Sequence, residues 1–213
     1  MIKSPVPSQP PEDVQATSLN STSIKVAWSP PSLLTLHGIL QGYKILYKPV
    51  RQDEDEGDAN FKMTTRLDVV LSRLEKFTNY SIQVLAYTRK GEGVRSEPVF
   101  VHTQEDVPDV PVKIQAHAAN DSAIIVSWLP PISSNGKISK YSLYFNNMNS
   151  PEVDDIPIQL PPTTTTYMIG NLQRGRKFSF RLSASTSMGE GKKTQYISTS
   201  TLVVGEFSYI SID

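Results

Sequence analysis

Short runs in which apolar residues alternate with polar ones follow one another along most of this chain. The first half has such runs at 24–28, 43–47 and 80–86, and the second half repeats them at 124–128, 141–145 and 178–184. A period of two places alternate side chains on one face of a strand, so each run predicts a half-buried β-strand. No sustained stretch has apolar residues at helical spacing. About seven strands in each half predict an all-β chain of two sandwiches, each made of two antiparallel sheets.

The sequence repeats itself at an interval close to 100 residues. Trp28-Ser29-Pro30-Pro31 recurs as Trp128-Leu129-Pro130-Pro131 (128 − 28 = 100), and Gly91-Glu92-Gly93 recurs as Gly189-Glu190-Gly191 (189 − 91 = 98). Solenoid repeats are about 20–50 residues long, whereas this period is the size of an independent domain. We therefore predict one domain over residues 1–104 and a second over 105–202. Residues 203–213 fall outside the pattern, as a vector scar, the start of a next segment or an extra edge strand.

The charge balance gives no electrostatic support for bulk nucleic-acid binding. The chain has 21 basic and 21 acidic residues, and neither half is a polycation. It has no cysteine, hence no disulfide and no thiolate metal site. That absence is slightly more typical of reducing compartments but does not exclude an extracellular origin. No apolar run reaches the roughly 18 residues of a membrane span. The first residues lack the apolar core of a signal peptide, which fits a piece of a larger protein.

The sequence carries no signature of an enzyme. It lacks the Gly-x-Ser-x-Gly, His-Glu-x-x-His and phosphate-binding glycine motifs, so we predict no catalytic residue and no cofactor. Its three histidines, His37, His102 and His117, fall in separate predicted elements, which argues against a shared metal site. The acidic run 53–58 is superficially similar to a calcium loop, but the twelfth position holds Thr64 instead of glutamate. We predict a solvated, self-repelling loop there and no metal.

Three glycosylation sequons are candidates for modification. Their asparagines are Asn20, Asn79 and Asn120, each followed two positions later by serine or threonine. Asn20 and Asn120 occupy equivalent turns between the first two predicted strands (120 − 20 = 100). Three sequons at predicted turns favour secretion and glycan attachment, with chance polar turns as the alternative.

The loop after the first Trp-x-Pro-Pro motif is unusually apolar. It contains Leu33, Leu34 and Leu36, where the second half has the more ordinary stretch 132–136. These leucines either cover the rim of the core or form an exposed apolar patch for a partner or a preceding module. We take the three as the candidate partner contact. A small basic turn at 174–177 is interpreted as a solvated turn, with a polyanion site as the alternative.

Together, the doubled motifs resemble those of fibronectin type III modules. They are the early Trp-x-Pro-Pro, a tyrosine two strands later, a Leu-x5-Tyr pair and a Gly-x-Gly hairpin near the end. The resemblance implies two immunoglobulin-like, seven-stranded sandwiches with Trp28 and Trp128 packed between their sheets. It also implies a tyrosine corner, in which the Tyr80 hydroxyl bonds the backbone of the turn before its strand. The second domain has Phe178 at this position, so we expect its corner to be weaker by about 1 kcal/mol.

Several stretches resemble the Down syndrome cell adhesion molecule family and its relative Sidekick. They are residues 79–89, the Gly-x-Gly-Val-Arg-Ser hairpin, 105–108 and 136–141. The resemblance implies the extracellular part of a single-pass plasma-membrane receptor for neuronal recognition, of the axon-guidance and self-avoidance type. In that family homophilic specificity belongs mainly to immunoglobulin domains, while fibronectin modules form a stalk and add self-contacts. It implies partners that are proteins, namely another copy, another receptor or neighbouring modules, without nucleic acid or direct membrane contact.

The linker 104–111 is short, and its two prolines restrict the backbone, so we predict limited swing between the domains. The acidic run 53–58 is expected to attract Lys137 and Lys192-Lys193 across the joint, at about 0–1 kcal/mol for each exposed pair. Two other interpretations stay open: an intracellular structural array of the muscle-filament kind, and an accessory module of a secreted carbohydrate-active enzyme. Glycan attachment in secreting cells would separate the adhesion receptor from the intracellular array.

Overall fold

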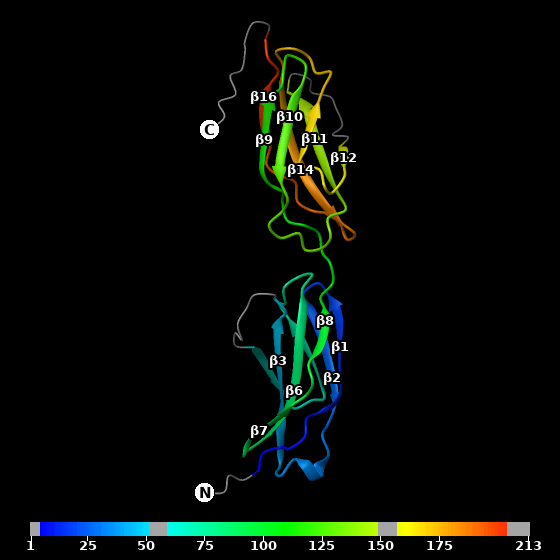
Figure 1. The fold of residues 1–213 in the computed structure, drawn as a ribbon, viewed down its shortest axis with the longest axis vertical. Helices are drawn as coiled ribbons and strands as arrows, with labels where there is room; N and C mark the ends of the chain where they lie inside the picture. Colours follow the sequence, from blue (N-terminus) through cyan, green and yellow to red (C-terminus); the bar gives the residue numbers. More distant parts are fainter. Residues whose placement is uncertain (1–4, 52–58, 149–156, 204–213) are drawn as a thin grey trace. The chain divides into compact units, whose positions relative to one another are not determined.

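The computed structural model describes residues 5–51, 59–148 and 157–203. The chain forms two compact units, Met1–Glu105 and Asp106–Asp213. Each unit is a sandwich of two antiparallel sheets, which confirms the predicted all-β fold (Figure 1). The acidic run 53–58 and most of the predicted tail, residues 204–213, lie outside the described residues.

The first domain packs a three-stranded sheet, in the order β1-β2-β5, against a sheet built around β3 and β6. In the second sheet β4 pairs with β3, while β7 and β8 both pair with β6. A single 3-10 turn, η1, lies between β2 and β3. The bounds of these elements are β1 Glu12–Asn20, β2 Ser23–Ser29, η1 Leu33–Thr35, β3 Leu40–Pro49, β4 Asn60–Thr64, β5 Asp68–Ser72, β6 Asn79–Thr88, β7 Gly91–Arg95 and β8 Val99–His102.

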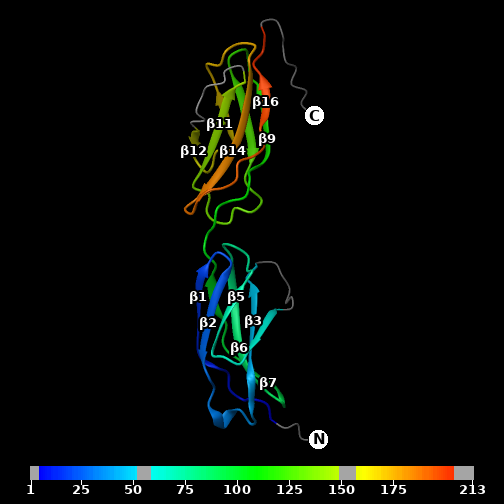
Figure 2. The same cartoon turned by 180° about the vertical axis from the view of Figure 1, so that it is seen from behind.

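The second domain repeats this arrangement (Figure 2). One sheet has the order β13-β10-β9, and the other has the order β12-β11-β14-β15 with β16 also paired to β14. The bounds are β9 Val112–Ala118, β10 Ile124–Leu129, β11 Lys140–Asn147, β12 Ile158–Leu160, β13 Thr166–Ile169, β14 Lys177–Thr186, β15 Gly189–Glu190 and β16 Ile197–Ser200.

The seventh strand of each sandwich is interrupted, and this explains why eight segments appear where seven strands are predicted. In the first domain the interruption holds Ser96, whose hydroxyl accepts a hydrogen bond from the Val84 backbone N–H at 3.0 Å. In the second domain Thr194 accepts from the Leu182 N–H at 3.0 Å in the same way. A side-chain oxygen thus replaces a ladder carbonyl where the strand bends away, so no buried N–H is left unpaired there.

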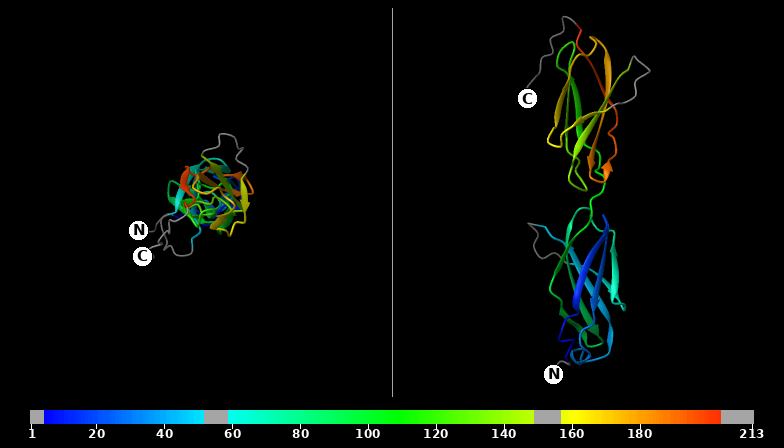
Figure 3. Two further views of the ribbon diagram at one scale, coloured as in Figure 1. Left: turned by 90° about the horizontal axis from the view of Figure 1, so that it is seen from above. Right: turned by 90° about the vertical axis from the view of Figure 1, so that its right-hand side faces the viewer.

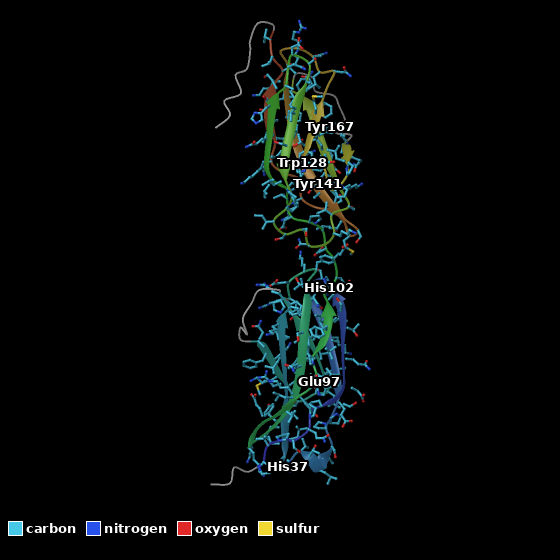
Figure 4. All side chains as sticks on the ribbon, viewed as in Figure 1. His37, Glu97, His102, Trp128, Tyr141 and Tyr167 are labelled. Carbon is cyan, nitrogen blue, oxygen red and sulfur yellow. The ribbon has the colours of Figure 1, made fainter. Side chains whose placement is uncertain are left out.

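The two layers of each domain enclose one apolar core (Figure 3). Trp28 packs edge-on against Tyr43 with ring centroids 5.3 Å apart, and Trp128 packs the same way against Tyr141 at 5.6 Å. Figure 4 shows the second pair near the middle of its domain. These aromatic pairs and the inward residues of both sheets fill the interior with side chains, so functional groups must be sought on outer faces, hairpins and loops.

Candidate functional site

The leucine loop divides its side chains between solvent and core. Leu33 is 84% exposed and Leu34 is 88% exposed, but Leu36 is only 4% exposed and belongs to the core cluster. The turn η1 causes this division, because the Leu36 N–H bonds back to the Leu33 carbonyl and carries the third leucine inward. Ile39 is also exposed. We define the leucine tip as Leu33, Leu34 and Ile39; Leu36, by contrast, is a core residue and not an accessible contact.

Each domain begins with a Val-Pro segment that is bonded to its own loops, a feature that sequence reasoning missed. In the first domain the Ser8 N–H donates to the Thr35 carbonyl at 2.9 Å. In the second domain the Asp109 N–H donates to the Ser133 carbonyl at 3.0 Å. The available signal was the recurrence of Val6-Pro7 as Val107-Pro108 (107 − 6 = 101), just before each first strand.

The Gly-x-Gly hairpins make room for these Val-Pro segments. A Cβ on Gly93 would lie 2.8 Å from the carbonyl oxygen of Pro7, and a Cβ on Gly191 would overlap the carbonyl oxygen of Pro108. The close approach of another backbone therefore requires glycine at both positions. We call the Val-Pro segment together with its hairpin glycine the entry clamp of each domain.

Hydrogen bonds next to the entry clamp of the second domain hold most of the linker against one domain or the other. The Gln104 N–H bonds the Asn20 carbonyl of the first domain at 3.3 Å. The Asp106 N–H bonds the Asn135 carbonyl of the second domain at 2.7 Å, and the Asp106 carbonyl accepts from the Thr186 hydroxyl at 2.8 Å. Only Glu105 therefore lies between residues that are anchored in different domains.

The tyrosine corner differs between the domains. The Tyr80 hydroxyl accepts a hydrogen bond from the Glu75 backbone N–H at 2.9 Å, and burial is the main cause that raises the pKa of Tyr80. Phe178 is also buried but has no hydroxyl. Three residues before each of these aromatic residues the backbone is left-handed, at Phe77 (φ 47°) in the first domain and at Gly175 (φ 61°) in the second.

A buried threonine fastens the same corner in both domains. The Thr103 hydroxyl donates to the Glu75 carbonyl at 2.8 Å and accepts from the Thr78 N–H at 2.9 Å. The Thr201 hydroxyl donates to the Gln173 carbonyl at 2.7 Å and accepts from the Arg176 N–H at 3.2 Å. The 98-residue spacing of the two threonines (201 − 103 = 98) was a signal that could have found them.

On the outer faces of the larger sheets, the equivalent glutamates Glu92 and Glu190 make different contacts. In the first domain Glu92 pairs with Lys44 at 2.7 Å, and the Lys44 ammonium lies 4.5 Å from the centre of the Phe61 ring. Phe61 and its neighbour Met63 are about half exposed beside the buried Leu46. This face thus presents exposed apolar side chains beside the Lys44–Glu92 ion pair.

In the second domain Glu190 accepts hydrogen bonds from the Tyr144 hydroxyl at 2.7 Å and from the Ser183 hydroxyl at 2.5 Å. Desolvation by burial and then the bond to Glu190 raise the pKa of Tyr144 to about 12. Desolvation opposes ionisation of Glu190, but the bonds from Ser183 and Tyr144 and the nearby Lys193 and Lys140 together hold its pKa below the usual value. The Arg181 guanidinium and the Lys193 ammonium lie over the Tyr144 ring, which makes this face polar.

All three sequon asparagines are exposed. Asn20 and Asn120 stand in matching turns in which their side-chain oxygens accept from the backbone N–H of Thr22 at 2.9 Å and of Ser122 at 2.8 Å. The hydroxyls of Thr22 and Ser122 donate to the same oxygens at 3.3 and 3.2 Å. Asn79 is the first residue of β6.

The histidines do not converge. His37 and His102 lie at opposite ends of the first domain (Figure 4), and His117 is on β9 of the second. Within 5–51, 59–148 and 157–203, no group of three or more histidine, cysteine, aspartate or glutamate residues could hold a metal ion. The basic turn at 174–177 is partly neutralised, because Arg174 pairs with Asp121 at 2.5 Å. No helix in the described part of the chain is long and apolar enough to cross a membrane.

The comparisons with known proteins agree with this geometry. A model of the fibronectin type III domain matches residues 9–102 and 109–200. Cell adhesion molecule Dscam2 of Drosophila melanogaster is 42% identical over 199 residues, which are 92% of this chain and 10% of that protein. Human cell adhesion molecule DSCAM is 42% identical over 92% of this chain and 10% of its own length. Mouse cell adhesion molecule DSCAML1 is 40% identical over 90% of this chain and 9% of its own. The chain thus spans about a tenth of the length of these relatives.

Proposed function

Because this chain belongs to the fibronectin type III family and its relatives include Dscam cell adhesion molecules, we propose that it is a non-catalytic extracellular segment of a neuronal adhesion receptor. In this role it spaces and orients other modules as a semi-rigid stalk of a single-pass membrane protein. The observation that carries the stalk role is the entry clamp, which binds residues 106–109 to the second domain and leaves Glu105 as the only residue between the anchored ends.

Breaking the second entry clamp tests this role. Gly191→Ala adds a Cβ that overlaps the Pro108 carbonyl oxygen, so Pro108 has to move away from the hairpin, which loosens the attachment of the linker to the second domain. Because the chain has no cysteine, spin labels attach only at introduced sites, such as the exposed equivalent positions Gln15→Cys and Gln115→Cys. We expect Gly191→Ala to broaden the distribution of label-to-label distances measured by pulsed electron resonance.

Gly93→Ala is the matched control, because it opens the equivalent clamp at the start of the first domain and leaves the linker alone. It should not change the distance distribution. A distribution as broad in the wild-type chain as in Gly191→Ala would contradict the stalk role.

Self-association through the leucine tip is the proposed contact function. Leu33 and Leu34 expose most of their surface at a loop, where a partner would remove apolar area from water. Sedimentation across concentration should show a dimer of the wild-type chain that Leu34→Glu weakens. Ile132→Glu is the control at the equivalent exposed loop position of the second domain (132 − 34 = 98). A wild-type chain that stays monomeric would reject this contact and leave the stalk role untouched.

Glycan attachment at Asn20, Asn79 and Asn120 is part of the same proposal. Exposed sequons, two of them in identical turns, support it. Secretion from eukaryotic cells should give a protein that loses mass on deglycosylation, with smaller losses in Asn20→Gln and Asn120→Gln. An unmodified secreted chain would favour the intracellular array instead.

A further inference from the structure

A hollow opens on the outer face of the larger sheet of the second domain, over β11 and β14 and between β12 and β15. Its lining includes Lys140, Ser142, Gln159, Ser185 and Glu190. The Ser185 hydroxyl is buried and has no hydrogen-bond partner among the described residues. Buried polar atoms are normally paired, so an unpaired hydroxyl just beneath the surface of a hollow indicates a place where a polar ligand atom would be favourable.

The first domain fills the equivalent place with its own side chain. Gly42 pairs with Tyr87 on neighbouring strands, as Lys140 pairs with Ser185 (140 − 42 = 98 and 185 − 87 = 98). A Cβ on Gly42 would lie 2.9 Å from the Tyr87 hydroxyl and 3.1 Å from a ring carbon, so the phenol ring lies directly across the glycine. The second domain has Ser185 in place of this tyrosine and Lys140 in place of the glycine, so the lysine side chain takes part of the ring's space and lines the hollow that remains.

We propose that this hollow is a binding site for a tyrosine side chain presented by a partner protein. The ring would lie in the hollow beside Lys140, displaced from the position that Tyr87 holds over Gly42 in the first domain, and its hydroxyl would find acceptors and donors in the lining. Glu190 offers a carboxylate that is already held in place by Ser183 and Tyr144. Lys140 supplies a cation at the rim, a group that aromatic ring faces attract. No residue of the leucine tip lines the hollow. The titration below measures binding and not interdomain distance, so the failure of this site and the failure of the proposed function are distinguishable.

The test is a titration of the ¹⁵N-labelled two-domain chain with N-acetyl-L-tyrosinamide, followed by amide chemical shifts. We expect saturable shifts at Ser142, Ser185 and Glu190, with a dissociation constant on the order of 1 mM. N-acetyl-L-phenylalaninamide lacks the hydroxyl and should bind several-fold more weakly. Shifts that do not saturate, that scatter over both domains, or that are equal for N-acetyl-L-leucinamide would overturn the proposal.

Two reciprocal variants sharpen the test. Ser185→Tyr places the ring of the first domain in the hollow and should abolish the shifts; the double variant Lys140→Gly with Ser185→Tyr reproduces both residues of that domain if the single variant folds poorly. Tyr87→Ser should open a second hollow and add saturable shifts at Gly42 and Glu92. Unchanged binding in a folded Ser185→Tyr chain, or in the folded double variant, would overturn the proposal.

Discussion

The two domains stabilise the same corner in different ways, one with a hydrogen bond and the other with a glycine in the turn. The first gains the Tyr80 hydrogen bond but holds Phe77 in the left-handed region, which costs a non-glycine residue about 1–2 kcal/mol. The second lacks the hydroxyl but places Gly175 at the left-handed position, where glycine avoids this cost. Since a hydrogen bond contributes about 1 kcal/mol, the two differences nearly cancel. The loss expected from Phe178 alone is therefore offset three residues away.

The largest effect expected from this comparison comes from the buried threonines. Thr201→Val removes a hydroxyl that pairs a backbone N–H and a carbonyl, and should destabilise the second domain by about 2–3 kcal/mol. Thr103→Val should cost the first domain less, because the Tyr80 hydroxyl still holds that turn. Urea unfolding followed by the indole N–H signals of Trp28 and Trp128 reports each domain separately. Equal losses of stability in the two variants would mean that the Tyr80 hydrogen bond gives the first corner no additional support.

The next largest effect is expected at the left-handed turn. Gly175→Ala should destabilise the second domain by about 1–2 kcal/mol, because alanine does not share the freedom of glycine at φ 61°. Gly170→Ala is the control in the same domain, since a Cβ there meets open space, and it should change stability by less than about 0.5 kcal/mol. The same urea experiment measures both variants. Similar losses in both would remove the compensation argued above.

Exchanging the corner aromatics should give a smaller change. Tyr80→Phe makes the first corner like the second and should cost about 1 kcal/mol, because the Glu75 N–H loses its partner. Phe178→Tyr restores a hydroxyl in the second domain and should recover up to the same amount. Thermal unfolding of the two single variants measures both changes, and a neutral Tyr80→Phe would show that water replaces the phenol.

The smallest expected effect on stability concerns the equivalent glutamates Glu92 and Glu190, and for Glu190 it appears on acidification. The folded-state pKa of Glu190 is lowered, so its contribution is present above the ordinary pKa of a glutamate and is lost as the pH falls through the lowered value. The wild-type second domain should therefore lose stability on acidification that Glu190→Gln does not lose. Glu92→Gln removes an exposed ion pair and should matter by less than about 1 kcal/mol. Identical acid sensitivity of wild type and Glu190→Gln would contradict this role.

Periodic patterns predicted the parts of the fold that are themselves periodic. Alternation located the strands around Trp28 and Tyr80 because each inward residue repeats every second position. The leucine loop has no such period, so the sequence grouped Leu36 with Leu33 and Leu34, and only the turn η1 separates it into the core.

Close approaches between backbone segments were likewise not predictable from the sequence patterns. The Gly-x-Gly motif was recognisable as a hairpin, but its contact with the Val-Pro segment joins residues more than 80 positions apart. The hollow around Ser185 exists because serine is much smaller than Tyr87, the equivalent residue of the first domain. Comparing the two halves position by position would have indicated it through the exchange of Tyr87 for serine.

The entry clamp also fixes what must be inherited together when such a module is copied or moved. Val107 and Pro108 precede the first strand of their sandwich, yet they complete its hairpin. A duplication that began at the strand itself would yield a module without a defined junction to its predecessor. A duplication that begins at the valine includes the residues that form the junction. Modules of this kind can therefore be reordered in a longer array with the junctions intact.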